Sequence, residues 1–262
     1  MTALLVALAA VLGLAVGSFL NVVVHRVPAG LSVVRPPSAC PSCSTAIPWY
    51  DNVPALSWLI LRGRCRRCHA RISPRYLLVE VLTSVLFAGM AWHVVELDLL
   101  AVAPAYLYVT AIGIALAFID AAHHRLPDAI VLPSYAVLGA LLVLASAVAG
   151  EWGRLLVAAA GGAGLWTLYF VLALVKTGGM GFGDVKLAGL LGMVLGWTGW
   201  GSLAVGAFGG FLVGGVVAIA LLLVGRAGRR TRIPFGPWMV VGALVGILVG
   251  ESLWSAYLDL AL

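Results

Sequence analysis

Two aspartates stand at the edges of apolar stretches, where a carboxylate is costly and usually has a function. Asp120 ends one apolar run, and Asp184 lies in the segment Gly181-Phe182-Gly183-Asp184, just before another run. The interval of 64 residues leaves room for two membrane crossings, so both acids are expected at the same face. Two neighbouring carboxylates share a proton, so one can act as a base on water and the other as an acid toward a carbonyl oxygen. The pair therefore predicts hydrolysis of the kind that aspartic proteases perform.

The residues near these acids have both chemical and purely structural interpretations. Gly181 and Gly183 lack side chains and would let a backbone or a substrate approach Asp184 closely. Lys186 could pair with a carboxylate, or it could mark the inner boundary of the next span. Taken alone, Asp120 could also cap a helix or form an ion pair at a helix end.

The segment after Asp120 holds further polar residues with less specific signals. Asp128 follows Pro127 and precedes an apolar run, so it is expected to cap the helix that begins there. His123 and His124 could bind a metal together with Asp120, but adjacent histidines face different ways. We therefore expect the two histidines in a solvated loop.

All four cysteines fall in two C-x₂-C pairs separated by 21 residues, a spacing typical of four-thiolate zinc sites. The alternatives are two disulfides or free thiols, and a reducing cytoplasm disfavours disulfides. The loop that holds the cysteines has little apolar core, and a bound metal can supply the missing folding energy. We therefore expect a structural zinc without an open ligand position, bound by Cys40, Cys43, Cys65 and Cys68.

Composition places these residues in a membrane protein. The chain is 63% hydrophobic and only 10% charged, which is too few charges to cover a water-facing surface. Pairs of glycines at small-xxx-small spacing predict close helix packing, at Gly192/Gly196 and at Gly206/Gly210/Gly214. Apolar runs predict eight spans, of which the sixth is short: 2–24, 76–96, 99–119, 129–149, 155–175, 187–200, 202–225 and 237–258. Glu80, one turn inside the second span, is either an interfacial residue or a polar group with a role in the bundle.

The basic residues predict the orientation of these spans. Every Lys and Arg except Arg154 falls on one side, which the positive-inside rule makes the cytoplasm, so both termini are expected outside. The formal net charge of +6 is then a topology signal and does not indicate nucleic-acid binding. The basic residues on the cytoplasmic side are eight arginines of the segment 25–75, Arg125, Lys176, Lys186, Arg226, Arg229, Arg230 and Arg232.

The sequence thus predicts an all-α polytopic membrane protein, with about eight transmembrane helices and a small cytoplasmic zinc-binding loop between the first and the second. The expected divisions are a first transmembrane helix at 1–24, a four-cysteine domain at 25–75 and a transmembrane aspartic protease domain at 76–262.

An ordered set of motifs resembles the type IV prepilin peptidase family, the bacterial leader peptidases that process prepilins and type II secretion pseudopilins. The likeness runs nearly from end to end of the chain. It rests on the opening segment 17–28, the paired C-x₂-C loop, the segment 71–76 leading to Glu80, the segment 118–128 with Asp120, the G-x-G-D segment 181–187 with Asp184, and Ile233-Pro234-Phe235-Gly236-Pro237.

The resemblance implies an aspartic endopeptidase of the bacterial inner membrane that uses Asp120 and Asp184 as its catalytic pair. It implies cleavage on the cytoplasmic side, after a glycine that ends a short basic leader. Many family members then N-methylate the new amino terminus with S-adenosylmethionine. A role for Glu80 in that methyl transfer is a further expectation, because its charge could hold the cationic sulfonium or amine.

Two other classes of membrane protein use acids in similar places. Presenilin-like or signal-peptide-peptidase-like intramembrane proteases also carry G-x-G-D, but the cysteine loop and Leu126-Pro127-Asp128 favour the prepilin type. A cation-coupled transporter would place its carboxylates near mid-membrane and show symmetry between two halves. Here both acids are expected at one face, and no such symmetry is seen.

Overall fold

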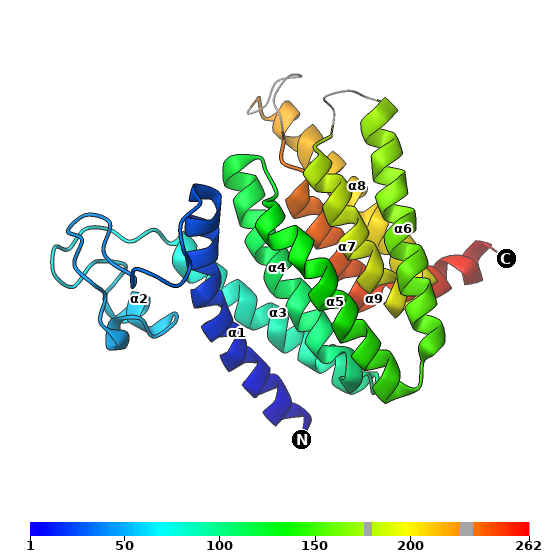
Figure 1. Cartoon of the computed structure of the whole chain (residues 1–262), viewed down its shortest axis with the longest axis horizontal. Coiled ribbons are helices and arrows are strands. Elements are labelled where there is room, and N and C mark those ends of the chain that lie inside the picture. The colour runs from blue at the N-terminus through cyan, green and yellow to red at the C-terminus, as the bar shows by residue number, and fades with distance from the viewer. Residues whose placement is uncertain (176–179, 226–232, 262) are drawn as a thin grey trace. The chain divides into compact units, whose positions relative to one another are not determined.

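The structure is a computed structural model that describes residues 1–175, 180–225 and 233–261. These ranges are helical apart from turns, loops and two isolated bridges, which confirms the all-α prediction (Figure 1). The chain divides into two compact units, residues 1–97 and 98–262. Five of the basic residues used to predict orientation lie outside the described ranges: Lys176, Arg226, Arg229, Arg230 and Arg232.

The first unit is a pair of long helices joined by the cysteine loop. Helix α1 (Thr2–Arg26) packs along α3 (Arg75–Glu96), and the loop between them holds the short turns η1 (Val27–Ala29) and η2 (Trp49–Asp51) and the short helix α2 (Leu56–Ile60). The two long helices approach closely because Gly13 and Gly17 face α3. A Cβ atom added at Gly13 would lie 2.7 Å from Ser84 Cα, and one added at Gly17 would lie 2.7 Å from Glu80 Cα.

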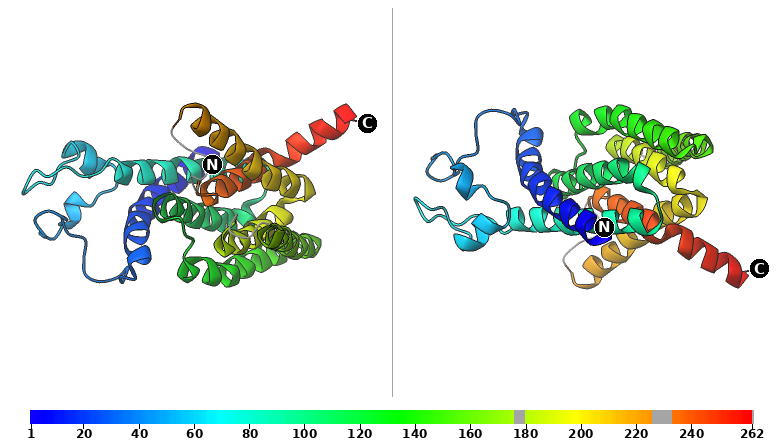
Figure 2. Two further views of the ribbon diagram at one scale, coloured as in Figure 1. Left: turned by 90° about the horizontal axis from the view of Figure 1, so that it is seen from above. Right: turned by 90° about the horizontal axis from the view of Figure 1, so that it is seen from below.

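The second unit is a bundle of six helices after the turn η3 (Leu100–Val102). Helix α6 packs along α7, and α8 packs along α9 (Figure 2). Helix α7 also contacts α5, α8 and α9, and most of its residues are buried. The helices are α4 (Ala103–His123), α5 (Asp128–Ala149), α6 (Trp152–Val175), α7 (Phe182–Thr198), α8 (Trp200–Leu223) and α9 (Gly236–Ala261).

Small residues produce the close contacts in this bundle, as their spacing predicts. A Cβ atom at Gly161 would lie 2.6 Å from Gly192 O, and one at Gly196 would lie 2.5 Å from Val157 O. A Cβ atom at Gly210 would lie 3.3 Å from Met239 Cα. Backbones therefore meet directly, which is how membrane helices gain packing energy without a hydrophobic driving force between them.

Seven helices of the described residues are long and apolar enough to cross a membrane: α1, α3, α4, α5, α6, α8 and α9. Helix α7 has 17 residues and corresponds to the short sixth span of the sequence prediction. Its neighbours in the bundle bury it, so it needs less contact with lipid than the longer helices. The structure therefore confirms the predicted fold class, a polytopic helical membrane protein with a four-cysteine loop between its first two long helices.

Candidate functional site

Asp120 lies in the last turn of α4, with 5% of its surface exposed. The helix ends at His123 because His124 adopts a left-handed conformation, with φ of 51°, and donates its N–H to Asp120 O at 2.8 Å. Pro127 then occupies the N-cap of α5. The helix thus extends about one turn beyond the predicted span end at residue 119 and holds Asp120 on regular backbone.

A backbone amide from the start of α9 fixes the Asp120 carboxylate. Gly236 donates its N–H to Asp120 Oδ2 at 2.9 Å, and this hydrogen bond is buried. A Cβ atom at Gly236 would lie only 2.8 Å from the same oxygen, so the position accepts glycine alone without a shift of the acid. Sequence reasoning noted Gly236 only as part of a family motif, because a backbone N–H leaves no side-chain signal.

Asp184 lies in the first turn of α7 and points back toward the start of its own helix. Its Oδ2 accepts the N–H of Gly181, the N-cap residue, at 3.1 Å, and its N–H bonds to Gly181 O at 3.0 Å. Gly181 has an extended backbone, with φ of −77° and ψ of 146°, which directs its N–H toward the carboxylate. Each aspartate thus uses its Oδ2 atom to accept one backbone N–H.

The structure brings the two acids within electrostatic reach of each other. The charge of Asp120 acts on Asp184. Gly183 assists this approach because the buried side chain of Leu126 packs on it. A Cβ atom at Gly183 would lie 3.0 Å from Leu126 Cβ, so a larger residue would separate the start of α7 from the segment that follows α4.

Lys186 pairs with Asp128, one of the two interpretations that its sequence position left open. Its Nζ atom lies 2.8 and 2.9 Å from the two carboxylate oxygens of Asp128, and 5.1 Å from the centroid of the Phe182 ring. The prediction that Asp128 caps α5 is wrong. Pro127 is the N-cap, Asp128 is the first helical residue, and no side chain caps the helix. The carboxylate binds a lysine of α7 instead and ties the starts of α5 and α7 together.

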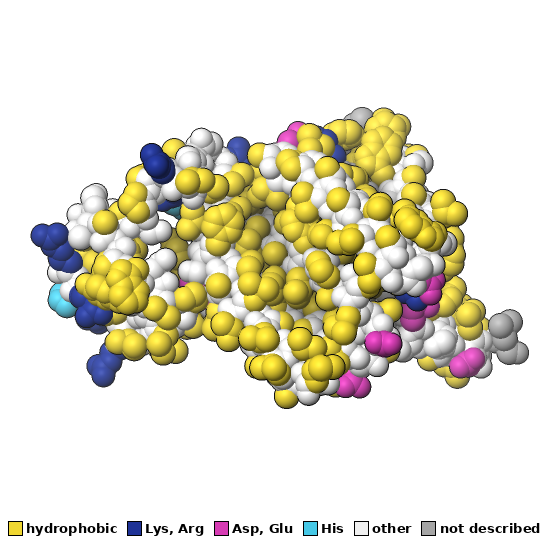
Figure 3. All heavy atoms as spheres, turned by 60° about the horizontal axis from the view of Figure 1, so that its bottom comes forward, with side chains coloured by type: hydrophobic (Ala, Val, Ile, Leu, Met, Phe, Trp, Pro, Cys, Tyr) yellow, Lys and Arg dark blue, Asp and Glu magenta, His cyan; other side chains and the backbone are white. Residues whose placement is uncertain are grey.

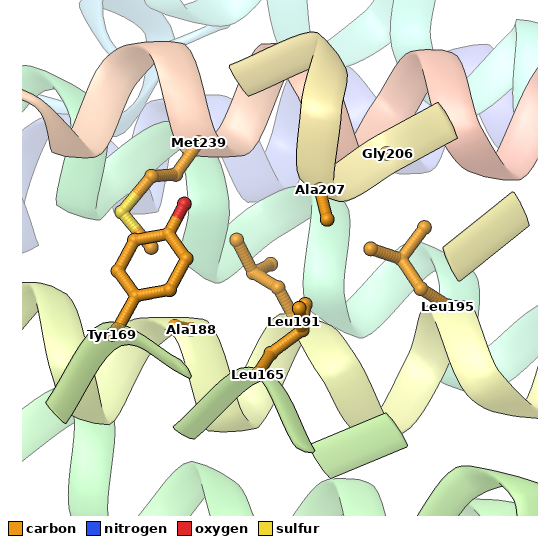
Figure 4. A pocket seen from close by; sticks show the side chains of 8 residues that line it. All are labelled: Leu165, Tyr169, Ala188, Leu191, Leu195, Gly206, Ala207 and Met239. Carbon is orange, nitrogen blue, oxygen red and sulfur yellow. The ribbon is translucent and has the colours of Figure 1, made fainter. Parts of the chain in front are cut away.

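A narrow apolar crevice lies next to Asp184 along α7. Figure 4 shows Tyr169 of α6 and Met239 of α9 pointing into it from different helices. Ala188, one turn after Asp184, also lines it. The Tyr169 ring packs on Phe235, with ring centroids 6.2 Å apart, and Phe235 directly precedes the glycine that holds Asp120. Apolar side chains therefore line the part of α7 that follows Asp184.

The four cysteines cluster in the first unit as their spacing predicts. All are free, and their sulfur atoms lie within 4.8 Å of one another. Cys40 Sγ and Cys68 Sγ are 3.7 Å apart, close to the ~3.8 Å edge of a tetrahedron with metal–sulfur bonds of about 2.3 Å. Within the described ranges this is the only such group of potential ligands, and His123 and His124 belong to none. The sulfur positions fit a tetrahedral metal.

The two C-x₂-C turns repeat one backbone geometry, 25 residues apart. In the first turn Cys40 donates to Thr45 O at 2.9 Å, and in the second Cys65 donates to Ala70 O at 2.9 Å. Isolated bridges close both turns, Ala39 with Ala46 and Arg64 with Arg71, and a left-handed residue follows each second cysteine, at Ser44 and His69. Such paired turns direct two sulfurs each toward one point.

Hydrogen bonding within the first turn prepares a thiolate. Cys43 Sγ lies 3.4 Å from Thr45 Oγ1, and this contact with Thr45 lowers the pKa of Cys43 to about 6. A thiol that ionises near neutral pH is ready to bind a metal, since the thiolate is the ligand form.

Glu80 lies in the second turn of α3, where 8% of its surface is exposed. Its Oε2 atom accepts the N–H of Ala55, from the cysteine loop, at 2.7 Å. Helix α1 lies directly beside this residue, since a Cβ atom at Gly17 would lie 2.7 Å from Glu80 Cα. Glu80 therefore ties α3 to the cysteine loop at a position where α1 packs closely.

Comparison with known proteins agrees with the motifs over nearly the whole chain. Residues 11–94 match the bacterial Peptidase A24 N-terminal domain, and residues 107–224 match the Type IV leader peptidase family. A relative from Stutzerimonas stutzeri, named prepilin leader peptidase/N-methyltransferase, is 36% identical over 97% of this chain and 93% of its own length. Relatives of the same name from Neisseria gonorrhoeae and Pseudomonas aeruginosa are 37% and 36% identical, over 96% and 95% of this chain and 93% and 92% of their own lengths.

No solved structure matches the chain. The family matches cover both units, and the relatives align over both the cysteine loop and the acid pair. This agreement is incompatible with the transporter and presenilin-like alternatives, and the chain therefore belongs to the Type IV leader peptidase family, Peptidase A24.

Proposed function

We propose that this protein cleaves the leader of type IV prepilins or pseudopilins at the inner membrane of a bacterium, with Asp120 and Asp184 as its catalytic pair. One observation carries the assignment of the residues. The ends of two helices bring two carboxylates within electrostatic reach, and each of them already accepts one fixed backbone N–H. The names of the relatives support the substrate class.

The arrangement leaves one oxygen of each acid for chemistry. Gly236 and Gly181 donate their N–H groups to the Oδ2 atoms, and we assign the Oδ1 atoms to water and substrate. The ionised acid would take a proton from water, whose oxygen attacks the scissile carbonyl carbon. The protonated acid would donate its proton to the carbonyl oxygen. Collapse of this tetrahedral species breaks the carbon–nitrogen bond, as the first acid gives its proton to the leaving amine. One hydroxyl of the tetrahedral carbon returns a proton to the second acid, so the new carboxyl group forms and the pair again shares one proton.

The cytoplasmic location of this cleavage rests on charge. Arg125 follows the end of α4 near Asp120, Lys186 lies in the first turns of α7 near Asp184, and the segment 25–75 carries eight arginines. Positive residues favour the cytoplasmic side. A basic leader would then reach the acids from the side on which the pilin is synthesised.

The second proposed reaction is N-methylation of the new amino terminus, with S-adenosylmethionine as methyl donor. The relatives carry both activities in their names. Glu80 is the residue of the first unit that we propose to hold the cationic amine or sulfonium, since its carboxylate is buried and already ordered by Ala55. Zinc on the four cysteines would supply folding energy to the loop that presents Ala55.

Substitution of each acid tests the cleavage proposal. Asp120→Asn and Asp184→Asn should each abolish prepilin cleavage in membranes while the protein still inserts, because one carboxylate cannot serve as both base and acid. Asp259→Asn removes an acid at the far end of α9 and should cleave at the wild-type rate. Full turnover by either single variant of the proposed pair would contradict the assignment.

A pre-cleaved pilin separates the two reactions. The Asp184→Asn protein, given this pilin and a labelled methyl donor, should transfer the label at a rate near that of the wild type. Methyl transfer needs a neutral amine aligned with the donor carbon, and the acid pair has no part in that alignment. Loss of labelling together with cleavage in a well-folded variant would place both reactions on the acid pair.

A further inference from the structure

The cysteine loop exposes a group of large apolar side chains on one short segment, residues 49–60. Trp49 is 82% exposed, Leu59 57% and Ile60 67%. Leu56, Leu59 and Ile60 follow the i, i+3, i+4 spacing, so they share one face of α2. Contiguous exposed apolar side chains in a small polar domain indicate a surface that binds another phase or molecule.

Internal hydrogen bonds fix this segment as one body. The buried hydroxyl of Ser57 donates to Tyr50 O at 3.1 Å and accepts the N–H of Val53 at 3.1 Å, which joins η2 to α2. Trp58 packs over Gly63, where an added Cβ atom would lie 2.7 Å from the indole ring. The exposed side chains are therefore presented by an ordered scaffold.

The depth of the segment follows from its tie to a spanning helix. Ala55 donates its N–H to Glu80 Oε2 at 2.7 Å. Glu80 lies five residues after Arg75, the first residue of α3, and this corresponds to about 7.5 Å along a helix. With α3 spanning a bilayer from Arg75, this distance would place Ala55 near the boundary between lipid headgroups and acyl chains.

The charge beside the apolar face suits an anionic surface. Tyr50 lies beneath the guanidinium of Arg66, at 5.7 Å from ring centroid to Cζ, and Arg66 pairs with Asp51 at 2.6 Å. In Figure 3, dark blue basic side chains lie beside hydrophobic ones on the cysteine loop. The arginines that follow α2 without a further acid are Arg62, Arg64, Arg67 and Arg71.

From these observations we infer that residues 49–60 form an interfacial anchor, which inserts Trp49, Leu56, Leu59 and Ile60 at the headgroup boundary of an anionic leaflet. Aromatic residues are enriched at this depth, and apolar faces flanked by arginine bind anionic lipid. The arginines after α2 would contact lipid phosphates. The negative surface potential of the leaflet attracts each of these arginines and so strengthens binding. The inference rests on α3 spanning the membrane and does not depend on the proposed peptidase activity.

Photocrosslinking in bilayers tests the anchor directly. The full-length protein is reconstituted in nanodiscs of phosphatidylcholine with phosphatidylglycerol, with a benzophenone amino acid in place of Leu59. The matched control carries it in place of Val34, an apolar residue of the same loop that is 79% exposed and lies outside the segment. Irradiation should give a lipid adduct several-fold more abundant at position 59 than at position 34, measured by mass spectrometry of the loop peptides.

Other occupants of the surface would give other products. An adduct between position 59 and protein, either this chain or an added prepilin, would overturn the inference, as would equal lipid adducts at both positions. Arg62→Ser in the same crosslinking protein should lower the lipid adduct about fivefold in anionic nanodiscs, and not in nanodiscs of phosphatidylcholine alone. An adduct insensitive to both Arg62 and lipid charge would overturn the electrostatic part. None of these readouts involves prepilin cleavage.

Discussion

The cysteine loop and the six-helix bundle are held together in opposite ways. Within residues 25–75, all of which the structure describes, only Cys40, Ser57 and Gly63 are buried. In the bundle, most of α7 is buried, and its glycines meet the backbones of neighbouring helices. The loop lacks a core and has a few polar ties and a cluster of four cysteines with the geometry of a metal site, whereas the bundle depends on contacts between atoms of the main chain.

This difference assigns different sensitivities to the two regions. A domain held by metal should fail when its ligands are removed and should tolerate changes of volume on its surface. A bundle held by close backbone contacts should fail when a single methyl group is added at a contact, because packed interiors cannot absorb it. Asp120 and Asp184 belong to the bundle, so their geometry should be equally sensitive to small changes of volume.

The largest expected effect is on the bundle. Gly192→Val places side-chain atoms against the carbonyl of Gly161, on the facing helix α6, and should cost about 3 kcal/mol or more. Denaturant unfolding in micelles would measure this loss, and prepilin cleavage should fall with it. Gly164→Ala, on a face of α6 where an added Cβ meets nothing within 4 Å, is the matched control. Equal stability of the two variants would contradict the claim that close backbone contacts hold the bundle together.

Removal of metal should have the complementary effect. Zinc binding contributes about 10 kcal/mol to the folding of small four-ligand domains, so a chelator or Cys43→Ser should expose the loop to limited proteolysis. The unfolding of the bundle should stay unchanged. Ser42→Ala, at an exposed position inside the same turn, should keep both metal and protection. A loop that stays protected after complete loss of metal would show that its polar ties suffice.

The acid pair should respond to a single methyl group as the bundle does. Gly236→Ala brings a Cβ atom to 2.8 Å from Asp120 Oδ2 and displaces the carboxylate from its N–H partner. A displacement of about 1 Å can lower kcat roughly a hundredfold, while KM changes little because the substrate contacts remain. Gly215→Ala in α8, where nothing lies within 4 Å of the added Cβ, should leave kcat unchanged. Equal kcat values for the two variants would show that Gly236 does not position the Asp120 carboxylate for catalysis.

The sequence predicts those features that depend on the type of side chain and on the spacing of side chains along the chain. Apolar runs locate the helices, and two C-x₂-C pairs locate the cysteine cluster, because both signals are carried by the residues themselves. The end of α4 is misplaced by about one turn because hydropathy falls before the helical backbone ends at His123. The role of Gly236 escapes prediction because its contribution is a main-chain N–H from a segment 116 residues after Asp120.

The error at Asp128 has a related cause. A carboxylate after a proline at a helix start has two possible partners, the N–H groups of its own helix and a distant cation. Local sequence favours the first partner, and only the packing of α5 against α7 brings Lys186, 58 residues away, to the carboxylate. Tertiary contacts therefore decided an ambiguity that the segment alone could not resolve.

The smallest expected effect concerns this ion pair, a polar tie within the region otherwise held by packing. Asp128 is half exposed, at 56% of its side chain, and the Lys186 side chain is 20% exposed. Water screens such a pair, so a double-mutant cycle with Asp128→Asn and Lys186→Met should give a coupling of about 0.5–1 kcal/mol in unfolding free energy. Cleavage should decline a few-fold in each single variant, and the double variant should be no worse than the weaker of the two. Additive losses of cleavage would mean that the two residues act separately on the acid pair. A coupling free energy well above this range would mean that the ion pair, and not glycine packing, sets the position of α7.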